Sequence, residues 1–97
     1  MRLTDDQLTI IRTYFAARPV KRAWLFGSYA RGEADEQSDV DLLVAPDYSK
    51  RLGWEFYLWP TDLGALLGVS VDVVTEDGLS KYIKPLIDKD KELIYEN

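Results

Sequence analysis

The 97-residue sequence contains no cysteine and no histidine. Without cysteine the chain can form neither a disulfide framework nor a thiolate metal site. Without histidine it lacks the commonest general base and the usual zinc ligand, and a Ser-His-Asp hydrolase is excluded. Any catalysis must therefore depend on carboxylate, hydroxyl, lysine or arginine side chains.

Long hydrophobic runs are absent as well. No apolar stretch approaches the roughly 20 residues that span a bilayer, and the first residues, Met-Arg-Leu-Thr-Asp-Asp, lack the apolar core of a signal peptide. We therefore expect no membrane association and a cytoplasmic location.

Positive charge is scarce relative to negative charge. The chain has 12 Lys and Arg residues against 17 Asp and Glu residues, which gives a net charge of −5. Affinity for nucleic acid depends mainly on basic side chains that displace counterions from phosphates. Stable binding to long DNA or RNA is therefore not expected, whereas a small nucleotide or a protein partner fits this charge better.

The composition that remains suits a single globular domain, which we predict over residues 1–97. A hydrophobic content of 46% and a charged content of 30% are ordinary for such a domain. Hydrophobic periodicity and turn signals predict helices over residues 4–18, 28–32 and 51–67, a last helix with Pro85 near its start, and strands over 20–26, 39–45 and 69–74. Pro60 interrupts the third helical pattern and predicts a kink or two short helices there. Residues 93–95 are expected either to add a terminal strand or to pack against the core.

The clearest functional signal lies between Phe26 and Val44. The small-residue turn Gly27-Ser28 follows the first predicted strand, and Asp39 and Asp41 open the second. Because successive side chains of a strand alternate between faces, these two carboxylates point the same way, roughly 6.6 Å apart. Such a pair suits a divalent cation, and a tight turn with free N–H groups beside it suits a nucleoside triphosphate with its magnesium.

A third acid, Asp72, interrupts the third predicted strand. Aspartate is unfavourable in strands and costly to bury unpaired, and two acids about 4 Å apart repel by roughly 4 kcal/mol at an effective dielectric near 20. One such acid alone could cap a strand, pair with Arg31 or occupy an edge. Three acids beside the Gly27-Ser28 turn favour a shared cation site. If these residues form one site, the end of the first strand must lie beside the starts of the second and third strands. The first two strands then run antiparallel, the second and third run parallel, and the sheet is mixed.

These residues resemble the sequence signature of a known family. Gly27-Ser28, ten intervening residues and Asp39-Val40-Asp41-Leu42 resemble the signature of the DNA polymerase beta-like nucleotidyltransferase superfamily. The fuller stretches 27–32 and 38–44 are similar to its minimal nucleotidyltransferase (MNT) branch. Val71-Asp72-Val73-Val74 stands where that branch has its third acid. The resemblance implies the fold class, an α/β domain with a small mixed sheet flanked by helices in the order α-β-α-β-α-β-α.

The resemblance also implies roles for individual residues. Gly27 and Ser28 would hold the β- and γ-phosphates. Asp39 and Asp41 would bind magnesium ions, and Asp72 would complete the metal site and help to deprotonate an acceptor hydroxyl. The remaining nucleotide-binding candidate has two interpretations of equal weight: Arg31 contacts phosphate, or it pairs with Asp39, Asp41 or Glu33 as part of the scaffold.

The implied activity is transfer of a nucleoside monophosphate, AMP from ATP, to a hydroxyl with the help of two magnesium ions. Members of the MNT branch are typically paired with a HEPN-domain protein in a toxin–antitoxin system, in which the transferase is the antitoxin and adds AMP to a tyrosine of its partner. Two alternatives stay open: transfer to a small molecule such as an antibiotic, and a non-catalytic antitoxin that neutralises by binding.

An aromatic segment is the other unusual feature of the sequence. It contains Trp54, Phe56, Tyr57 and Trp59. One interpretation places Phe56 in the core and the others on an ordinary amphipathic surface. The other makes the segment a partner-binding surface, because Trp and Tyr concentrate at protein interfaces. The aromatic ring of Tyr29 is expected to pack against the first helix rather than to stack on a base.

Overall fold

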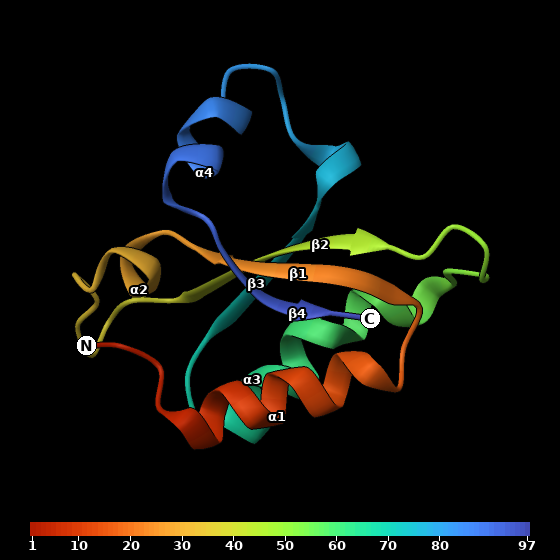
Figure 1. Cartoon of the computed structure of the whole chain (residues 1–97). Helices are drawn as coiled ribbons and strands as arrows, with labels where there is room; N and C mark the ends of the chain where they lie inside the picture. The colour runs from red at the N-terminus through yellow and green to blue at the C-terminus, as the bar shows by residue number, and fades with distance from the viewer.

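The computed structural model describes all 97 residues as a four-stranded sheet with helices on both sides (Figure 1). The strands are β1 Val20–Phe26, β2 Val40–Pro46, β3 Val71–Thr75 and β4 Glu92–Glu96; the α-helices are α1 Asp5–Ala16, α2 Ser28–Arg31, α3 Trp59–Leu67 and α4 Lys84–Asp90; and two short 3-10 helices are η1 Trp54–Leu58 and η2 Glu76–Gly78. Helices α1 and α3 pack together below the sheet, and α4 lies on its other side.

The sheet is mixed, as the sequence predicts. Its strand order is β3-β2-β1-β4. Strand β1 is antiparallel to β2 and to β4, whereas β2 and β3 run parallel. Both predicted strand orientations are confirmed. The last predicted segment forms a true strand, β4, which adds one element after the final helix of the expected order.

Local sequence signals predict most helix and strand boundaries to within two or three residues of their positions in the structure. Thr4 caps α1 in a capping box with Gln7, and β1 has the predicted bounds. Pro60 lies in the first turn of α3, where its missing N–H costs nothing, and η1 precedes it, so that the chain forms two short helices there. Two strand starts differ from expectation: β2 begins one residue after Asp39, and β3 begins at Val71 rather than at residue 69.

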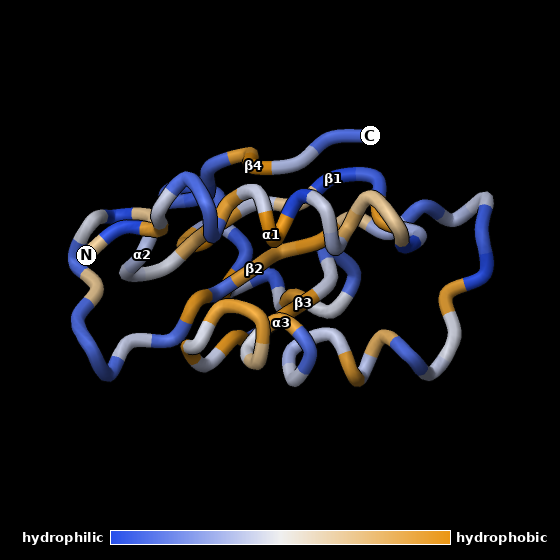
Figure 2. The backbone as a smooth tube through the Cα atoms, turned by 90° about the horizontal axis from the view of Figure 1, so that it is seen from below, coloured by the Kyte–Doolittle hydropathy of each residue, from blue (hydrophilic) through white to orange (hydrophobic).

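The hydrophobic core lies between the sheet and the pair α1 and α3. Strand β2 runs through the middle of the molecule and is largely hydrophobic, whereas the loops at its two ends are hydrophilic (Figure 2). The largest fully buried side chains are those of Trp59, Phe15, Ile11, Leu42, Leu43 and Leu63. The burial of these side chains fixes the position of β2, which carries part of the site described below.

The structure corrects both interpretations of the aromatic segment at Trp59, because each of them placed this side chain at the surface. Trp59 is only 1% exposed and packs edge-to-face against Phe15 and Phe56 at ring-centroid distances of 6.0 and 5.0 Å, so it belongs to the core and not to an interface. The reason is its place at the first position of α3, which turns the ring toward α1. Phe56 is only partly buried, while Trp54 and Tyr57 are 72% and 79% exposed.

None of the helices is long and apolar enough to cross a membrane. On the side of the sheet opposite α1 and α3, the covering layer is thin. Helix α4 contributes one buried side chain, Ile87, and the ammonium group of Lys91 lies 4.9 Å from the ring centroid of Trp24 in β1. Much of this face is therefore open near the start of β2.

Candidate active site

The turn between β1 and α2 requires a glycine. Gly27 has a φ of 75° and a ψ of −156°, a conformation that side chains with a Cβ rarely adopt. A Cβ placed on Gly27 would lie 2.4 Å from Oδ2 of Asp41. The carbonyl of Gly27 accepts hydrogen bonds from the N–H groups of Ala30 and Arg31. The backbone of this turn therefore lies directly against the Asp41 carboxylate, with the first N–H groups of α2 free of intrahelical partners.

Two of the three predicted acids lie side by side. Asp41 and Asp72 are register partners in the parallel pair β2 and β3, so their Cα atoms are about 4.8 Å apart across the ladder and their side chains share one face. Phe26 is the register partner of Asp41 on β1. The side chains of Phe26, Asp41 and Asp72 therefore form one row across the sheet, on the face opposite the main core. Phe26 directly precedes Gly27, so this row lies next to the Gly27 turn. Asp41 is half-buried and Asp72 is exposed.

Burial and like charge act together on Asp41. Desolvation, followed by the negative charges of Asp72 and Asp39, raises the pKa of Asp41 from its ordinary 3.8 to about 6, and the positive charge of Arg31 opposes this rise. The carboxylate is thus held in an environment that disfavours its charged form. A cation bound at this place would reverse that effect.

Asp39 takes a different position from the other two acids. It directly precedes β2, is exposed, and is close enough to Asp41 to contribute to the raised pKa of that group. No group of three or more acidic side chains in the structure forms a cluster that could hold one metal ion. The structure therefore brings Asp41 and Asp72 together and leaves Asp39 at the rim, and the three-acid metal site remains a prediction.

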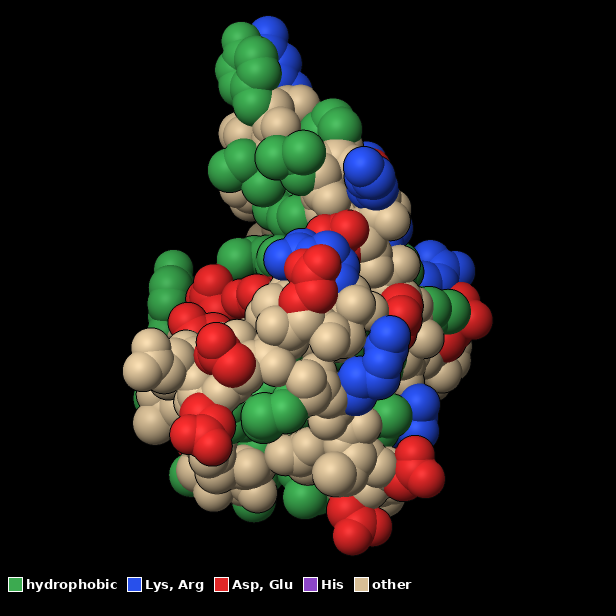
Figure 3. Space-filling view, turned by 90° about the vertical axis from the view of Figure 1, so that its left-hand side faces the viewer, with side chains coloured by type: hydrophobic (Ala, Val, Ile, Leu, Met, Phe, Trp, Pro, Cys, Tyr) green, Lys and Arg blue, Asp and Glu red, His purple; other side chains and the backbone are tan.

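The residues present fit magnesium by their chemistry. All three candidate ligands are carboxylates, the hard oxygen donors that magnesium prefers, and magnesium commonly uses one or two carboxylates together with substrate phosphates. Acidic side chains gather on the end of the molecule that carries α2, below the projecting segment around α4 (Figure 3). Burial and the negative charges of Asp72 and Asp39 outweigh the positive charge of Arg31 and raise the pKa of Asp41, so a bound cation would favour the charged form of this carboxylate.

Arg31 is held as part of the scaffold. Its Nε donates to Glu33 at 2.9 Å and its Nη1 donates to Asp90 of α4 at 2.7 Å, and these two carboxylates raise the pKa of the guanidinium further. The pairing with Glu33 was one of the two interpretations of this residue. Asp90 gave no signal in the sequence, because the two partners are 59 positions apart. The guanidinium remains 43% exposed, which leaves part of it accessible to a ligand.

The two other predicted residues of the turn differ in burial. Ser28 is half-buried at the start of α2, where its hydroxyl makes no hydrogen bond within the chain. Tyr29 is 4% exposed and belongs to the main core cluster, which confirms that it packs rather than offering a ring to a base.

Comparison with known proteins agrees with this geometry. The profile of the family described as "Nucleotidyltransferase domain" matches residues 7–94. MJ0128 of Methanocaldococcus jannaschii, named as a candidate protein adenylyltransferase, is 44% identical over 81 residues, which are 78% of this chain and 76% of that protein. The protein adenylyltransferase MntA of Thermococcus cleftensis is 44% identical over 68 residues, which are 66% of this chain and 64% of MntA.

Solved structures with the same fold were found as well. A structure described as a candidate minimal nucleotidyltransferase superposes with a TM-score of 0.75 at 34% identity and covers 90% of this chain and 88% of its own. A toxin–antitoxin structure with AMP-PNP superposes with a TM-score of 0.73 at 20% identity, covering 97% of this chain and 75% of its own. The second likeness carries information on the fold alone.

Proposed function

Since this chain belongs to the nucleotidyltransferase domain family, we propose that it transfers AMP from ATP to a tyrosine of a HEPN-domain partner and thereby acts as the antitoxin of that partner. The main observation behind this proposal is that Asp41 and Asp72 are register partners beside the Gly27 turn. This arrangement brings a carboxylate pair on one face of the sheet next to the Gly27 turn.

Four similar proteins support the choice of acceptor and of nucleotide. The relatives MJ0128 and MntA carry the name of protein adenylyltransferases, in the first case as a candidate. One structure of similar fold is described as a tri-AMPylated HEPN toxin in complex with an MNT antitoxin, and another toxin–antitoxin structure contains AMP-PNP. A protein acceptor and an adenine nucleotide therefore suit this chain better than an antibiotic acceptor.

The proposed chemistry is an in-line displacement at phosphorus. The tyrosine oxygen attacks the α-phosphorus of ATP, a new P–O bond forms, the bond between the α-phosphorus and the bridging oxygen breaks, and pyrophosphate leaves. Asp72, which is exposed on β3, would take the proton of the attacking hydroxyl.

The turn and the acids would position the other groups. The N–H groups of the Gly27-Ser28 turn and the Ser28 hydroxyl would bind the β- and γ-phosphates, and Gly27 would allow those phosphates to approach the backbone. Asp39, Asp41 and Asp72 would hold magnesium, which when bound would neutralise the charge that develops on the attacking and leaving oxygens. Catalysis would then depend mainly on positioning and electrostatics.

The proposal is tested with purified components. The chain is incubated with ATP, Mg²⁺ and a candidate HEPN-domain partner, and the intact mass of that partner is measured. We expect an added AMP with the wild type and none with Asp39→Ala/Asp41→Ala. The matched control, Asp5→Ala/Asp6→Ala, removes two exposed acids from the first turn of α1 and should transfer AMP like the wild type.

Two outcomes would contradict the proposal. The first is an unmodified partner after incubation with the wild type. The second is neutralisation of the partner's toxicity by Asp39→Ala/Asp41→Ala without any adduct, which would establish a binding-only antitoxin.

A further inference from the structure

The outer edge of β3 is open to another strand. Strand β3 is at one end of the sheet, and the carbonyl of Ser70, just before it, accepts from the N–H of Val40 in β2. The N–H and C=O of one strand residue point to the same side, and neighbouring residues alternate. Asp72 and Val74 therefore bond to β2, whereas the backbone groups of Val71, Val73 and Thr75 point away from the sheet.

The opposite edge of the sheet is protected. Nε of Arg12 donates to the carbonyl of Ile94 in β4 at 2.7 Å, and a register shift interrupts the pairing of β4 with β1. Side-chain bonds and bulges of this kind block the addition of a further strand. No side-chain hydrogen bond of the structure reaches the outward groups of β3. Of the two edges, only that of β3 is available for pairing.

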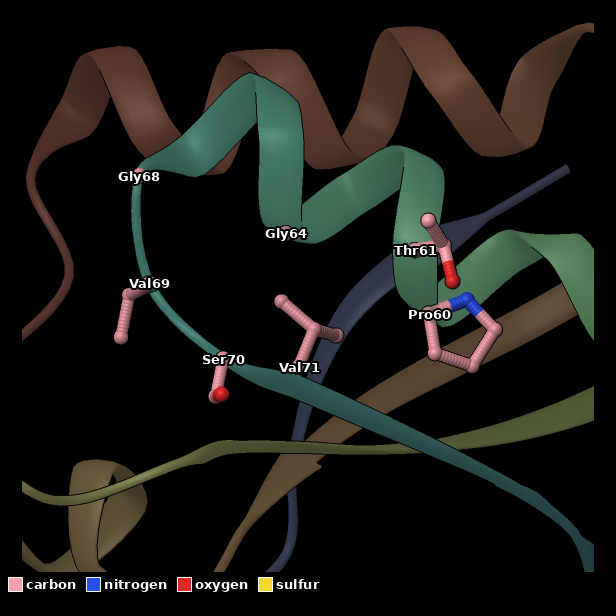
Figure 4. A pocket seen from close by; sticks show the side chains of 7 residues that line it. All are labelled: Pro60, Thr61, Gly64, Gly68, Val69, Ser70 and Val71. Atoms are coloured by element: carbon pink, nitrogen blue, oxygen red, sulfur yellow. The ribbon is translucent and has the colours of Figure 1, made fainter.

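A pocket of about 480 Å³ lies beside this edge, on the side of the sheet that faces α3 (Figure 4). Its walls come from the segment that leads into β3, including Ser70 and Val71, and from α3, including Thr61 and Gly64. No charged side chain lines it. A Cβ on Gly64 would lie 3.3 Å from the carbonyl oxygen of Val69, so the glycine allows α3 to lie close to this segment.

The pocket and the candidate active site lie on opposite faces of the same strand. The pocket opens on the face of Val71, and the side chain of Asp72 points to the other face, beside Asp41. A strand added to β3 would lie about 4.8 Å from it, and its successive side chains would alternate between these two faces. Adjacent residues of such a strand would therefore reach the pocket and the acids.

We propose that the outer edge of β3 binds an extended segment of the acceptor protein as a fifth strand, with an uncharged side chain in the pocket and the neighbouring hydroxyl facing Asp72. This inference rests on the proposed function and specifies how its acceptor is recognised. Main-chain hydrogen bonds would supply affinity, and the pocket would supply specificity.

Charge and position identify the occupant as a partner rather than a second copy of this chain. The acceptor hydroxyl would lie among Asp39, Asp41 and Asp72, and the chain carries a net charge of −5. A second copy would bring the same negative charge to this place, whereas a segment without acidic residues would not meet this repulsion. The docking edge also continues directly into the candidate active site through Asp72.

The first test measures amide hydrogen exchange. The isotopically labelled chain is mixed with the same HEPN-domain partner that is used in the AMP-transfer test, and exchange is followed residue by residue by NMR. We expect the amides of Val71 and Val73 to exchange about tenfold or more slowly in the complex. Unchanged exchange of these two amides would overturn the docking proposal.

The second test blocks the pocket. Thr61 is exposed, so Thr61→Trp fills the pocket without removing a core contact. We expect it to raise the KM for the partner about tenfold or more and to leave the Kd for ATP, measured by calorimetry, unchanged. The matched control is Leu66→Trp, because Leu66 is exposed on the part of α3 that lines a separate groove with α1. It should retain the wild-type KM.

The outcomes separate this inference from the proposed function. A wild-type KM in Thr61→Trp would overturn the docking edge while AMP transfer stands. Protected Val71 and Val73 amides without any adduct on the partner would support the docking edge and contradict AMP transfer. Neither protection nor an adduct would overturn both.

Discussion

The residue that best shows the conflict between stability and function is Asp41. It lies half-buried between two other acids, and these surroundings raise its pKa to about 6. The folded-state pKa is above the unfolded value, so the folded chain binds more protons than the unfolded chain between these two values. The contribution of Asp41 to stability is therefore fully present below about pH 4 and is lost as the pH rises through about 6.

This titration predicts that Asp41→Asn stabilises the metal-free chain at neutral pH while abolishing transfer. We expect a rise in Tm of about 3 °C at pH 7.5, a small value because a half-exposed carboxylate is screened by water. The advantage should disappear near pH 4, and thermal denaturation without divalent cations measures it. Asp6→Asn, which removes an exposed acid of α1, is the control. An identical pH dependence of Tm in Asp41→Asn and wild type would contradict this explanation.

Gly27 provides a second prediction at the scale of one residue. Gly27→Ala combines a φ of 75° with a Cβ only 2.4 Å from Oδ2 of Asp41, so the carboxylate or the turn must move. A displacement of about 1 Å in an active site can cost about 100-fold in rate, and we expect a loss of that order in AMP transfer. The measurement is the initial rate of adduct formation by mass spectrometry.

The matched control for this change is Gly68→Ala. Gly68 has a φ of 73° and no atom within 4 Å of an added Cβ, so its substitution carries similar backbone strain without a clash. Both variants should lose about 1 kcal/mol of stability or somewhat more. Because Gly68 lines the pocket proposed for the partner, the comparison uses kcat at a saturating concentration of the partner. Only Gly27→Ala should lose kcat, and an equal loss of kcat in the two variants would show that strain alone is responsible.

At the scale of secondary structure, the site depends on three connections. The parallel pairing of β2 with β3 brings Asp72 beside Asp41. The antiparallel pairing of β1 with β2 places the Gly27 turn at the start of β2. The third connection joins α2 to α4 through Arg31, which bridges Glu33 and Asp90. Helix α4 buries only Ile87, so this bridge is a main contact that holds it near the turn.

We therefore predict that Arg31→Gln loosens α4. Loss of both ion pairs should speed hydrogen exchange of the α4 amides and leave exchange in β2 unchanged. The control is Arg22→Gln, which removes a comparable exposed pair with Glu96 between β1 and β4 and should not affect α4. The same variant separates the two roles of Arg31: an unchanged Kd for ATP indicates the scaffold, and a weakened Kd indicates a phosphate contact.

At the scale of the whole molecule, two features are at opposite ends of β2. The acids and the Gly27 turn are at its start, and the exposed aromatic segment of η1 follows its end (Figure 1). Trp54 and Tyr57 stand beside the first turn of α3, which also supplies Thr61 to the pocket along β3.

We predict that Trp54→Ser/Tyr57→Ser weakens binding of the HEPN-domain partner about tenfold or more, because exposed aromatic side chains often carry interface energy. The fold should be unaffected, since both side chains are more than 70% exposed. The comparison variant is Tyr82→Ser, which removes a ring that is 77% exposed on the segment leading to α4. Calorimetry gives the affinities. If Tyr82→Ser alone weakens binding, the partner lies on the α4 side instead.

Local rules determined much of this protein directly from its sequence. The capping box at Thr4 fixes the start of α1, and Pro60 separates η1 from α3. The period of two in a strand predicts that Asp39 and Asp41 share a face, but β2 begins only at Val40 and leaves Asp39 at the rim. The glycine-serine turn and the spaced acids were sufficient to indicate the family, because phosphate and metal binding require particular residue types at short and fixed separations.

Only the tertiary structure decided the relations between distant segments. Hydrogen bonding between β2 and β3 fixed the register of Asp41 with Asp72, side-chain packing buried Trp59, and folding joined Arg31 to Asp90. Strand order also left the edge of β3 open while Arg12 covered the edge of β4. These relations depend on which strands pair and in what register, and no periodicity within one segment carries that information.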